Sequence, residues 1–303
     1  MENNQPIGIF DSGIGGTSIW QEIHQLLPNE KTIYLADSKN APYGQKSKQE
    51  IIALSMKNTD FLLKMKCKLI VVACNTATTN AIQELRAKYN VPFIGIEPAI
   101  KPAATNSKTQ TIGILATKGT LNSELFHKAT EMYQDTTIVE QVGHGLVQLI
   151  EGGQINSSEM DKLLQSYLQP MIEANIDYLV LGCSHYPYLI PQIKKILPEH
   201  IRIIDSGQAV ARQTQKVLQE KVGISNLKTP DIGLLKRPCD RSGRRWLYIT
   251  ADFGTKQSIS NYDRPTTNSH QHHNNSWRLA IGHNWHVARM HRASMSFYPL
   301  NCL

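Results

Sequence analysis

The sequence predicts an α/β protein in which parallel sheets form two similar lobes. First, short apolar segments of strand length alternate with amphipathic segments of helix length over about the first 207 residues, a pattern typical of a parallel sheet covered by helices. Second, two of the apolar segments, LIVVACNTAT and YLVLGCSHYP, each lead through a small residue into one cysteine, Cys74 or Cys183, and a polar pair. Ligands bind beyond the carboxyl ends of such strands. We therefore expect two open, flavodoxin- or Rossmann-like parallel sheets with the active site in the cleft between them.

Eight segments have the length and apolar character of strands. They are residues 7–10, 32–36, 69–73, 92–96, 111–115, 136–140, 177–182 and 201–204. Apolar residues recur at intervals of three and four between them, which predicts helices over residues 17–27, 47–65, 78–88, 121–131 and 160–173. Pro98 and Pro102 follow the fourth strand, and IGILATKGT then echoes the opening IGIFDSGIGG. This echo indicates that a second lobe begins there.

The chain accordingly divides into three parts. We expect a first lobe at residues 1–97 completed by a returning helix within 208–228, a second lobe at 98–207, and an atypical basic tail at 229–303 rich in His, Arg and Asn. The net charge of +7 lies mostly in that tail: residues 229–303 hold ten Lys or Arg and four Asp, giving +6, which leaves 22 basic and 21 acidic residues, or +1, for residues 1–228. The charge therefore gives no reason to expect a nucleic-acid partner for the lobes.

The cysteine pattern and the amino terminus bear on the compartment. The five cysteines are Cys67, Cys74, Cys183, Cys239 and Cys302. An odd number without short paired spacing argues against a disulfide framework or a zinc ribbon, so we expect reduced thiols and no metal. The amino terminus lacks a basic region followed by an apolar one, and no stretch approaches the ~20 apolar residues of a membrane span. We expect a cytoplasmic protein with no membrane partner.

Polar loops follow the first two predicted strands. DSGIGGT places Asp11 and Ser12 before three glycines and a helix, so that backbone N–H groups and a hydroxyl could hold a carboxylate, although the glycines could also serve turn geometry alone. ADSKNAPYG places Asp37, Tyr43 and Gly44 in an irregular segment overhanging the same cleft, or in an ordinary turn. Both loops are of the kind that an amino-acid substrate would require.

Only two of the cysteines stand where chemistry is expected. Cys67 precedes its strand, at the end opposite the cleft, where a buried cysteine is usually a small hydrophobic residue. Cys74 and Cys183 each end a strand before a predicted helix, and a helix amino terminus can lower a thiol pKa from ~8.5 toward neutrality. His185, close to Cys183, could hold or move a proton.

The four segments FDSGIGG, ADSKNAPYG, ACNTAT and GCSHYP, in this order, resemble the glutamate racemases of the cofactor-independent aspartate/glutamate racemase family over about residues 6–228. The resemblance implies that Cys74 and Cys183 are the two catalytic acid/base residues. Ser184 stands where many relatives have threonine, and Trp20 where smaller aliphatic residues are usual. The substrate-binding set that the resemblance implies is Asp11, Ser12, Tyr43, Gly44, Asn75, Thr76, Ser184 and His185, with Thr117 as an addition.

The resemblance also implies a reaction: L- and D-glutamate interconvert by proton transfer at Cα without cofactor or metal. Cys183 would deprotonate L-glutamate and Cys74 D-glutamate, assisted by His185 and Asp11 respectively. Glu151 in LIEGG is a third assisting candidate, with a solvated helix end as the alternative interpretation. Relatives tend to form homodimers and to supply D-glutamate for peptidoglycan, which shapes the cell wall.

Three other functions remain open from the sequence. They are an aspartate or broad-specificity racemase, a dithiol redox enzyme, and a binding protein that has lost turnover. The tail keeps the last alternative open, because it lacks sustained periodicity and departs from the family pattern. His270, His272 and His273 could bind a metal and the arginines nucleic acid, but such tracts are more often adventitious. We interpret the tail as irregular and as the product of a reading-frame change or a non-native extension.

Overall fold

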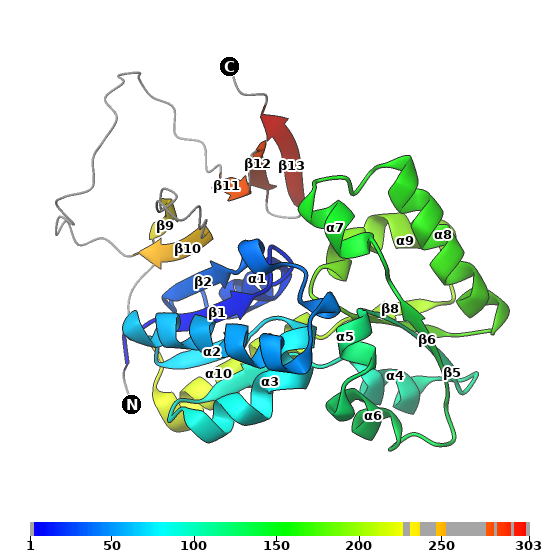
Figure 1. Ribbon diagram of the computed structural model, residues 1–303, viewed down its shortest axis with the longest axis horizontal. Coiled ribbons are helices and arrows are strands. Elements are labelled where there is room, and N and C mark those ends of the chain that lie inside the picture. The colour runs from blue at the N-terminus through cyan, green and yellow to red at the C-terminus, as the bar shows by residue number, and fades with distance from the viewer. Residues whose placement is uncertain are drawn as a thin grey trace.

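Two parallel sheets form the centres of the two lobes (Figure 1). The computed structural model describes residues 3–226, 231–236, 247–252, 277–281, 284–291 and 294–300. In the first lobe the parallel strands have the order β4-β3-β1-β2, and in the second the order is β6-β5-β7-β8. These strands are β1 (Ile7–Asp11), β2 (Thr32–Ala36), β3 (Leu69–Val72), β4 (Phe93–Gly95), β5 (Thr111–Ala116), β6 (Thr137–Val142), β7 (Tyr178–Gly182) and β8 (Arg202–Ile204). The predicted α/β class with two parallel-sheet lobes is confirmed.

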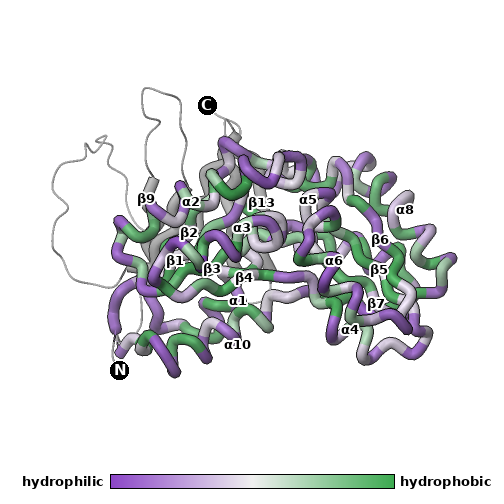
Figure 2. Tube along the Cα trace, turned by 60° about the horizontal axis from the view of Figure 1, so that its bottom comes forward, coloured by the Kyte–Doolittle hydropathy of each residue, from purple (hydrophilic) through white to green (hydrophobic). Residues whose placement is uncertain are grey.

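Helices cover both sheets. They are α1 (Thr17–Leu26), α2 (Lys48–Lys64), α3 (Asn75–Lys88), α4 (Ile100–Asn106), α5 (Lys118–Leu121), α6 (Glu124–Thr130), α7 (Leu146–Glu151), α8 (Ser158–Glu173), α9 (Ile190–Ile196) and α10 (Gly207–Val217). Short 3₁₀ turns are η1 (Ser38–Asn40), η2 (Tyr43–Gln45) and η3 (Tyr186–Leu189), and a π-helical turn, η4 (Leu218–Val222), follows α10. Every residue of β1, β2, β3 and β7 is buried, as parallel strands covered on both faces should be. Figure 2 shows these apolar strands inside polar helical surfaces.

The strand register brings the two cysteine strands to the same cleft. Phe10 of β1 pairs with Val72 of β3, so Asp11 and Cys74 leave the first sheet close together. Ala116 of β5 pairs with Gly182 of β7, so the next residues, Thr117 and Cys183, leave the second sheet side by side. The carboxyl ends of the strands therefore deliver these polar side chains to one place.

Helix α10 returns the chain to the first lobe. Its residues Val210 and Ala211 belong to the same buried cluster as Ile19 and Ile23 of α1, against which α10 packs. The division of the chain into lobes at particular residues stays a prediction.

The prediction of an irregular tail is wrong for five of its segments. Strands β9 (Asp231–Lys236) and β10 (Leu247–Asp252) are antiparallel, and β10 pairs with β2 at the edge of the first sheet; β11 (Trp277–Ile281), β12 (Asn284–His291) and β13 (Ser294–Leu300) form a separate antiparallel sheet. An edge strand such as β2 presents unpaired backbone groups, with which an extended segment can pair whatever its side-chain pattern. Cys239, Cys302 and the histidines at 270, 272 and 273 lie outside the described residues.

None of the described helices is long and apolar enough to cross a membrane. The described residues also contain no group of three or more His, Cys, Asp or Glu side chains placed to hold a metal ion.

A buried ion pair joins the beginning of the first lobe, at Asn3, to the segment that follows η4. Lys68 Nζ lies 2.7 Å from Glu30 Oε2, and both side chains are 1% exposed. The same ammonium donates to the carbonyl oxygens of Asn3 and Gly223, at 2.5 and 3.1 Å, and the Ser225 N–H donates to Glu30 Oε1 at 2.7 Å. Lys68 directly precedes β3. This pair therefore anchors the chain after η4 at the amino-terminal end of that strand, opposite the cleft.

We predict that Lys68→Met destabilises the protein strongly, because it leaves the Glu30 carboxylate buried beside an apolar side chain. Removing one partner of a buried pair typically costs about 3–5 kcal/mol. Denaturant unfolding followed by circular dichroism measures this loss. The control is Lys128→Met, which breaks the exposed Lys128–Glu124 pair and should leave the unfolding midpoint nearly unchanged. Equal midpoints for the two variants would contradict the prediction.

Candidate active site

A small closed cavity lies where the carboxyl ends of the two sheets meet. It is lined by Ser12, Pro42, Tyr43, Gly44, Cys74, Asn75, Thr76, Thr117, Val147, Cys183, Ser184 and His185. Its interior space is about 10 Å³, close to the minimum that one water molecule needs. A ligand the size of an amino acid can therefore enter only when the walls move apart. The cysteines and the substrate-binding residues that the sequence indicated line the cavity directly, except Asp11. Asp11 and the assisting candidate Glu151 lie outside the lining and bond to its residues Ser184 and His185.

Cys74 forms the N-cap of α3, which begins at Asn75, three residues earlier than the sequence pattern predicts. Its sulfur accepts a hydrogen bond from the Ala77 N–H at 3.4 Å, and its thiol donates to Ser12 Oγ at 3.8 Å. Burial raises the pKa of Cys74 well above its ordinary value, and the neighbouring Asp11 charge raises it further. The expectation of a lowered pKa is therefore wrong for Cys74, because the cost of burying a thiolate exceeds the effect of the helix amino terminus.

Asp11 connects the two lobes beneath the cavity. Its side chain is completely buried, and Oδ2 accepts hydrogen bonds from the N–H groups of Gly16 and Gly13, at 2.8 and 3.3 Å. Oδ1 accepts a hydrogen bond from Ser184 Oγ of the second lobe at 3.4 Å. Burial raises the pKa of Asp11, and the nearby His185 charge offsets part of this rise. Asp11 thus places a carboxyl group of raised pKa beside Cys74.

His185 stands beside Cys183, with Nδ1 3.8 Å from the sulfur. Its other nitrogen, Nε2, lies 2.7 Å from Glu151 Oε1, to which it donates when protonated, and 3.2 Å from the Gly15 backbone nitrogen. Burial alone would lower the pKa of His185, but its hydrogen bonds to Cys183 and Glu151, together with their charges, raise it well above its ordinary value. The arrangement therefore favours an imidazolium between the Cys183 sulfur and the Glu151 carboxylate.

Glu151 is better placed than the sequence indicated. Its side chain ends α7 and is only 17% exposed, and Oε1 also accepts a hydrogen bond from the Ile14 N–H of the first lobe at 2.8 Å. The alternative interpretation of a solvated helix end is wrong, because the carboxylate is bonded to both lobes. The sequence showed only that Glu151 is an acidic residue before two glycines. Its hydrogen-bond partners, Ile14 and His185, lie 137 and 34 residues away along the chain and could not be predicted from local pattern.

The glycine loop allows this close approach. A Cβ atom at Gly13 would lie 1.7 Å from Glu151 Oε1, and one at Gly15 would lie 2.2 Å from His185 Nδ1. Neither glycine has a positive φ. The loop therefore needs glycine so that the second lobe can pack against it, rather than for turn geometry.

Asn75 has both polar atoms of its side chain buried without a hydrogen-bond partner within the described chain. The residue is 2% exposed and lines the cavity. An unpartnered buried amide is costly, which indicates that it pairs with a ligand. A donor and an acceptor are thus available at the mouth of β3.

Three further residues hold the cavity wall in place. Thr76 and Thr117, from different lobes, have their hydroxyl oxygens 2.8 Å apart. The Tyr43 hydroxyl donates to Asp37 Oδ2 at 2.7 Å and accepts from Asn58 at 3.1 Å. Because that hydroxyl is engaged, Tyr43 offers a ligand its ring and backbone. Asp37 is a structural partner of Tyr43.

Trp20 and Cys67 lie outside the cavity. Trp20 donates from Nε1 to Thr32 Oγ1 at 3.0 Å and stacks on His24 in the core. Cys67 is buried against Gly8, and burial raises its pKa to about 12. Both residues therefore have structural surroundings.

Comparison with known proteins identifies relatives of this chain. The family model described as Asp/Glu/Hydantoin racemase matches residues 7–214. A protein of Ralstonia pickettii strain 12J named glutamate racemase is 46% identical over 214 residues, which is 70% of this chain and 76% of that protein. Among solved structures, glutamate racemase isoform RacE1 from Bacillus anthracis has a TM-score of 0.68 and 32% identity, over 74% of this chain and 85% of its own. Escherichia coli glutamate racemase in complex with L-glutamate and the activator UDP-MurNAc-Ala has a TM-score of 0.67 and 34% identity, over 74% and 86%.

The geometry predicts that His185 stays protonated to a pH well above the ordinary pKa of about 6.5 for histidine. Glu151→Gln should lower the pKa of His185, because it removes the charge that stabilises the imidazolium. Titration of ¹⁵N-labelled histidine side chains by NMR measures both values. Glu159→Gln, on α8, is the matched control and should leave the titration unchanged. If the His185 titration is the same in Glu151→Gln as in the wild-type protein, the assigned contact is wrong.

Proposed function

The chain belongs to the Asp/Glu/Hydantoin racemase family and is thus an isomerase, and we propose that it interconverts L- and D-glutamate with two cysteines as its acid and base. One observation carries the proposal: Cys74 from the first lobe and Cys183 from the second line one closed cavity. Inversion at Cα requires that a proton leave one face and that another arrive at the opposite face. Thiols from two different lobes can serve the two faces.

Cys183 deprotonates L-glutamate in this proposal, while Cys74 delivers a proton to the other face; the roles reverse for D-glutamate. The balance is simple: one C–H bond breaks to form S–H on one cysteine, and one S–H bond breaks on the other to form the new C–H. His185, held by Glu151, assists Cys183, and Asp11 assists Cys74. This assignment is supported by the 3.8 Å distance between His185 Nδ1 and the Cys183 sulfur, and by the effect of the Asp11 carboxylate on the pKa of Cys74.

The raised pKa of Cys74 has a consequence for the proposal. In this structure Cys74 is a thiol, because burial and Asp11 both disfavour the thiolate. The ammonium group of a bound amino acid brings a positive charge into the same space, and an opposite charge favours ionisation. Substrate binding would therefore help to form the base that the reaction needs.

The carbanion formed at Cα needs electrostatic stabilisation, because the α-proton of an amino acid is far less acidic than a thiol. Fixed donors in a cavity from which water is excluded supply this stabilisation most effectively. The donors that line the cavity are the Asn75 amide and the hydroxyls of Ser12, Thr76 and Ser184. The Asn75 amide, which has no partner within the described chain, is available to a substrate carboxylate.

Glutamate is the favoured substrate, because the Escherichia coli relative was solved with L-glutamate bound and the Ralstonia relative is named glutamate racemase. An aspartate or broad-specificity racemase is the alternative. We also propose that the product D-glutamate serves peptidoglycan synthesis in the cytoplasm, where both thiols stay reduced. A homodimer stays a prediction.

We predict that Cys74→Ser and Cys183→Ser each lower kcat for glutamate racemisation at least about 100-fold, because a positioned acid or base contributes 10²–10⁴-fold. Chiral chromatography of L- and D-glutamate, with L- and D-aspartate as comparison substrates, measures turnover. The matched control is Cys67→Ala, which removes a buried thiol outside the cavity and should retain activity. Turnover by either serine variant at the wild-type rate would contradict the two-cysteine assignment. Faster turnover of aspartate than of glutamate would contradict the substrate.

A further inference from the structure

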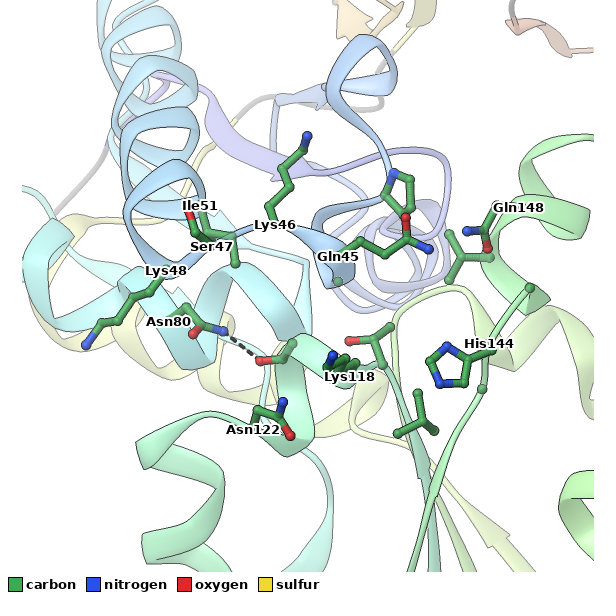
Figure 3. A pocket seen from close by; sticks show the side chains of 18 residues that line it. Gln45, Lys46, Ser47, Lys48, Ile51, Asn80, Lys118, Asn122, His144 and Gln148 are labelled. Atoms are coloured by element: carbon green, nitrogen blue, oxygen red, sulfur yellow. Dashed lines mark hydrogen bonds between the residues drawn. The ribbon is translucent and has the colours of Figure 1, made fainter.

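A much larger pocket adjoins the closed cavity (Figure 3). Its volume is about 590 Å³, and it shares Pro42, Gly44, Thr117 and Val147 with the lining of the cavity. We call this pocket the vestibule. Its other walls come from η2 and the start of α2, from α3 and α5, and from the segment 142–148. The two spaces are therefore neighbours separated by a thin shared wall.

The shared wall is tightly closed. A Cβ atom at Gly44 would lie 2.8 Å from Thr117 Cβ, and the Thr117 hydroxyl lies 2.8 Å from that of Thr76. Since Gly44 and Thr117 belong to different lobes, a small separation of the lobes at this contact would join the vestibule to the cavity. The vestibule is thus the space from which a ligand would reach the two cysteines through this wall.

The lining of the vestibule contains lysines, and the acidic residues near them lie outside that lining. Lys46, Lys48 and Lys118 are among its lining residues, and none of the described residues lining it is Asp or Glu. Lys48 is partly neutralised by Glu84, whose Oε1 lies 3.7 Å from its Nζ. Lys118 is exposed and forms no ion pair within residues 3–226.

Lys118 is the vestibule lysine nearest in sequence to the shared wall. It is the first residue of α5 and directly follows Thr117, which belongs to the shared wall. In Figure 3, Lys118 and His144 occupy the middle of the view, whereas Lys46 and Lys48 extend away in different directions. An exposed ammonium therefore follows the shared wall by one residue.

We propose that the vestibule captures the anionic substrate electrostatically and that Lys118 is the residue that steers it toward the cavity. The proposal rests on the proposed function. Glutamate carries two carboxylates and one ammonium at neutral pH, so its net charge is −1. A concave surface of one sign concentrates ligands of the opposite charge and speeds their association, and salt weakens this effect. Lys118 would act before the reaction, without touching the reacting atoms.

The expected signature is a loss in kcat/KM with little change in kcat. Lys118→Glu should lower kcat/KM for L-glutamate about tenfold at low ionic strength, because the charge at the entrance reverses. The deficit should shrink at 0.3 M salt, where the Debye length falls to roughly 6 Å. Lys118→Arg, which keeps the charge, should behave like the wild-type protein.

The matched control is Lys64→Glu. Lys64 is exposed and ends α2, sixteen residues after Lys48, a distance of about 24 Å along the helix axis. Lys64→Glu changes the net charge of the protein by the same amount as Lys118→Glu, but does so far from the vestibule. Lys64→Glu should therefore leave kcat/KM nearly unchanged at both ionic strengths.

Initial rates of L- and D-glutamate racemisation by the full-length wild-type chain and these three variants, at 0.02 M and 0.3 M ionic strength, test the proposal. A salt-sensitive loss in kcat/KM confined to Lys118→Glu supports it. An equal effect of Lys118→Glu and Lys64→Glu, a loss confined to kcat, or a loss independent of salt overturns it. If the wild-type chain does not turn over glutamate, the proposed function is wrong, and this inference with it. If the wild type is active and Lys118→Glu has the same kcat/KM, this inference alone is wrong.

Discussion

The contact between the glycine loop of the first lobe and the Glu151–His185 pair of the second is the interaction on which the site depends. Glu151 accepts hydrogen bonds from the Ile14 N–H and from His185, so one carboxylate joins both lobes. The absence of side chains at Gly13 and Gly15 lets it come this close. This contact holds Cys183 and its histidine opposite Asp11 and Cys74.

Closure of the cavity has two opposing consequences. It raises the pKa of Cys74 and Asp11, which makes the charged forms costly. It also excludes water from the place where charge develops on a substrate, which strengthens every fixed donor around it. The unpartnered Asn75 amide is unfavourable when buried, and the carboxylate of a bound amino acid would pair with it. The closed form is therefore suited to a ligand that carries an ammonium and carboxylates.

The sequence predicted those features that depend on local pattern. Apolar strands ending at Cys74 and Cys183 were evident because both faces of parallel strands are buried. Features that depend on distant contacts were not evident: Glu151 was underrated because its partners lie far away along the chain, and the pKa of Cys74 was expected to fall because the helix amino terminus is visible in sequence whereas burial beside Asp11 is not. The strands after residue 230 were missed because pairing with an edge strand uses backbone groups, not side-chain periodicity.

The position of solvent deuterium early in the reaction tests the two-cysteine account most directly. L-Glutamate is incubated with the protein in D₂O, and the reaction is stopped after a few per cent of turnover. The two enantiomers are then separated, and the deuterium content of each is measured by mass spectrometry. The account predicts that the D-glutamate formed carries deuterium at Cα while the remaining L-glutamate carries almost none, because one thiol removes the proton and the other supplies a deuteron. D-Glutamate that retains the original proton would show that a single group acts on both faces, and would contradict the account.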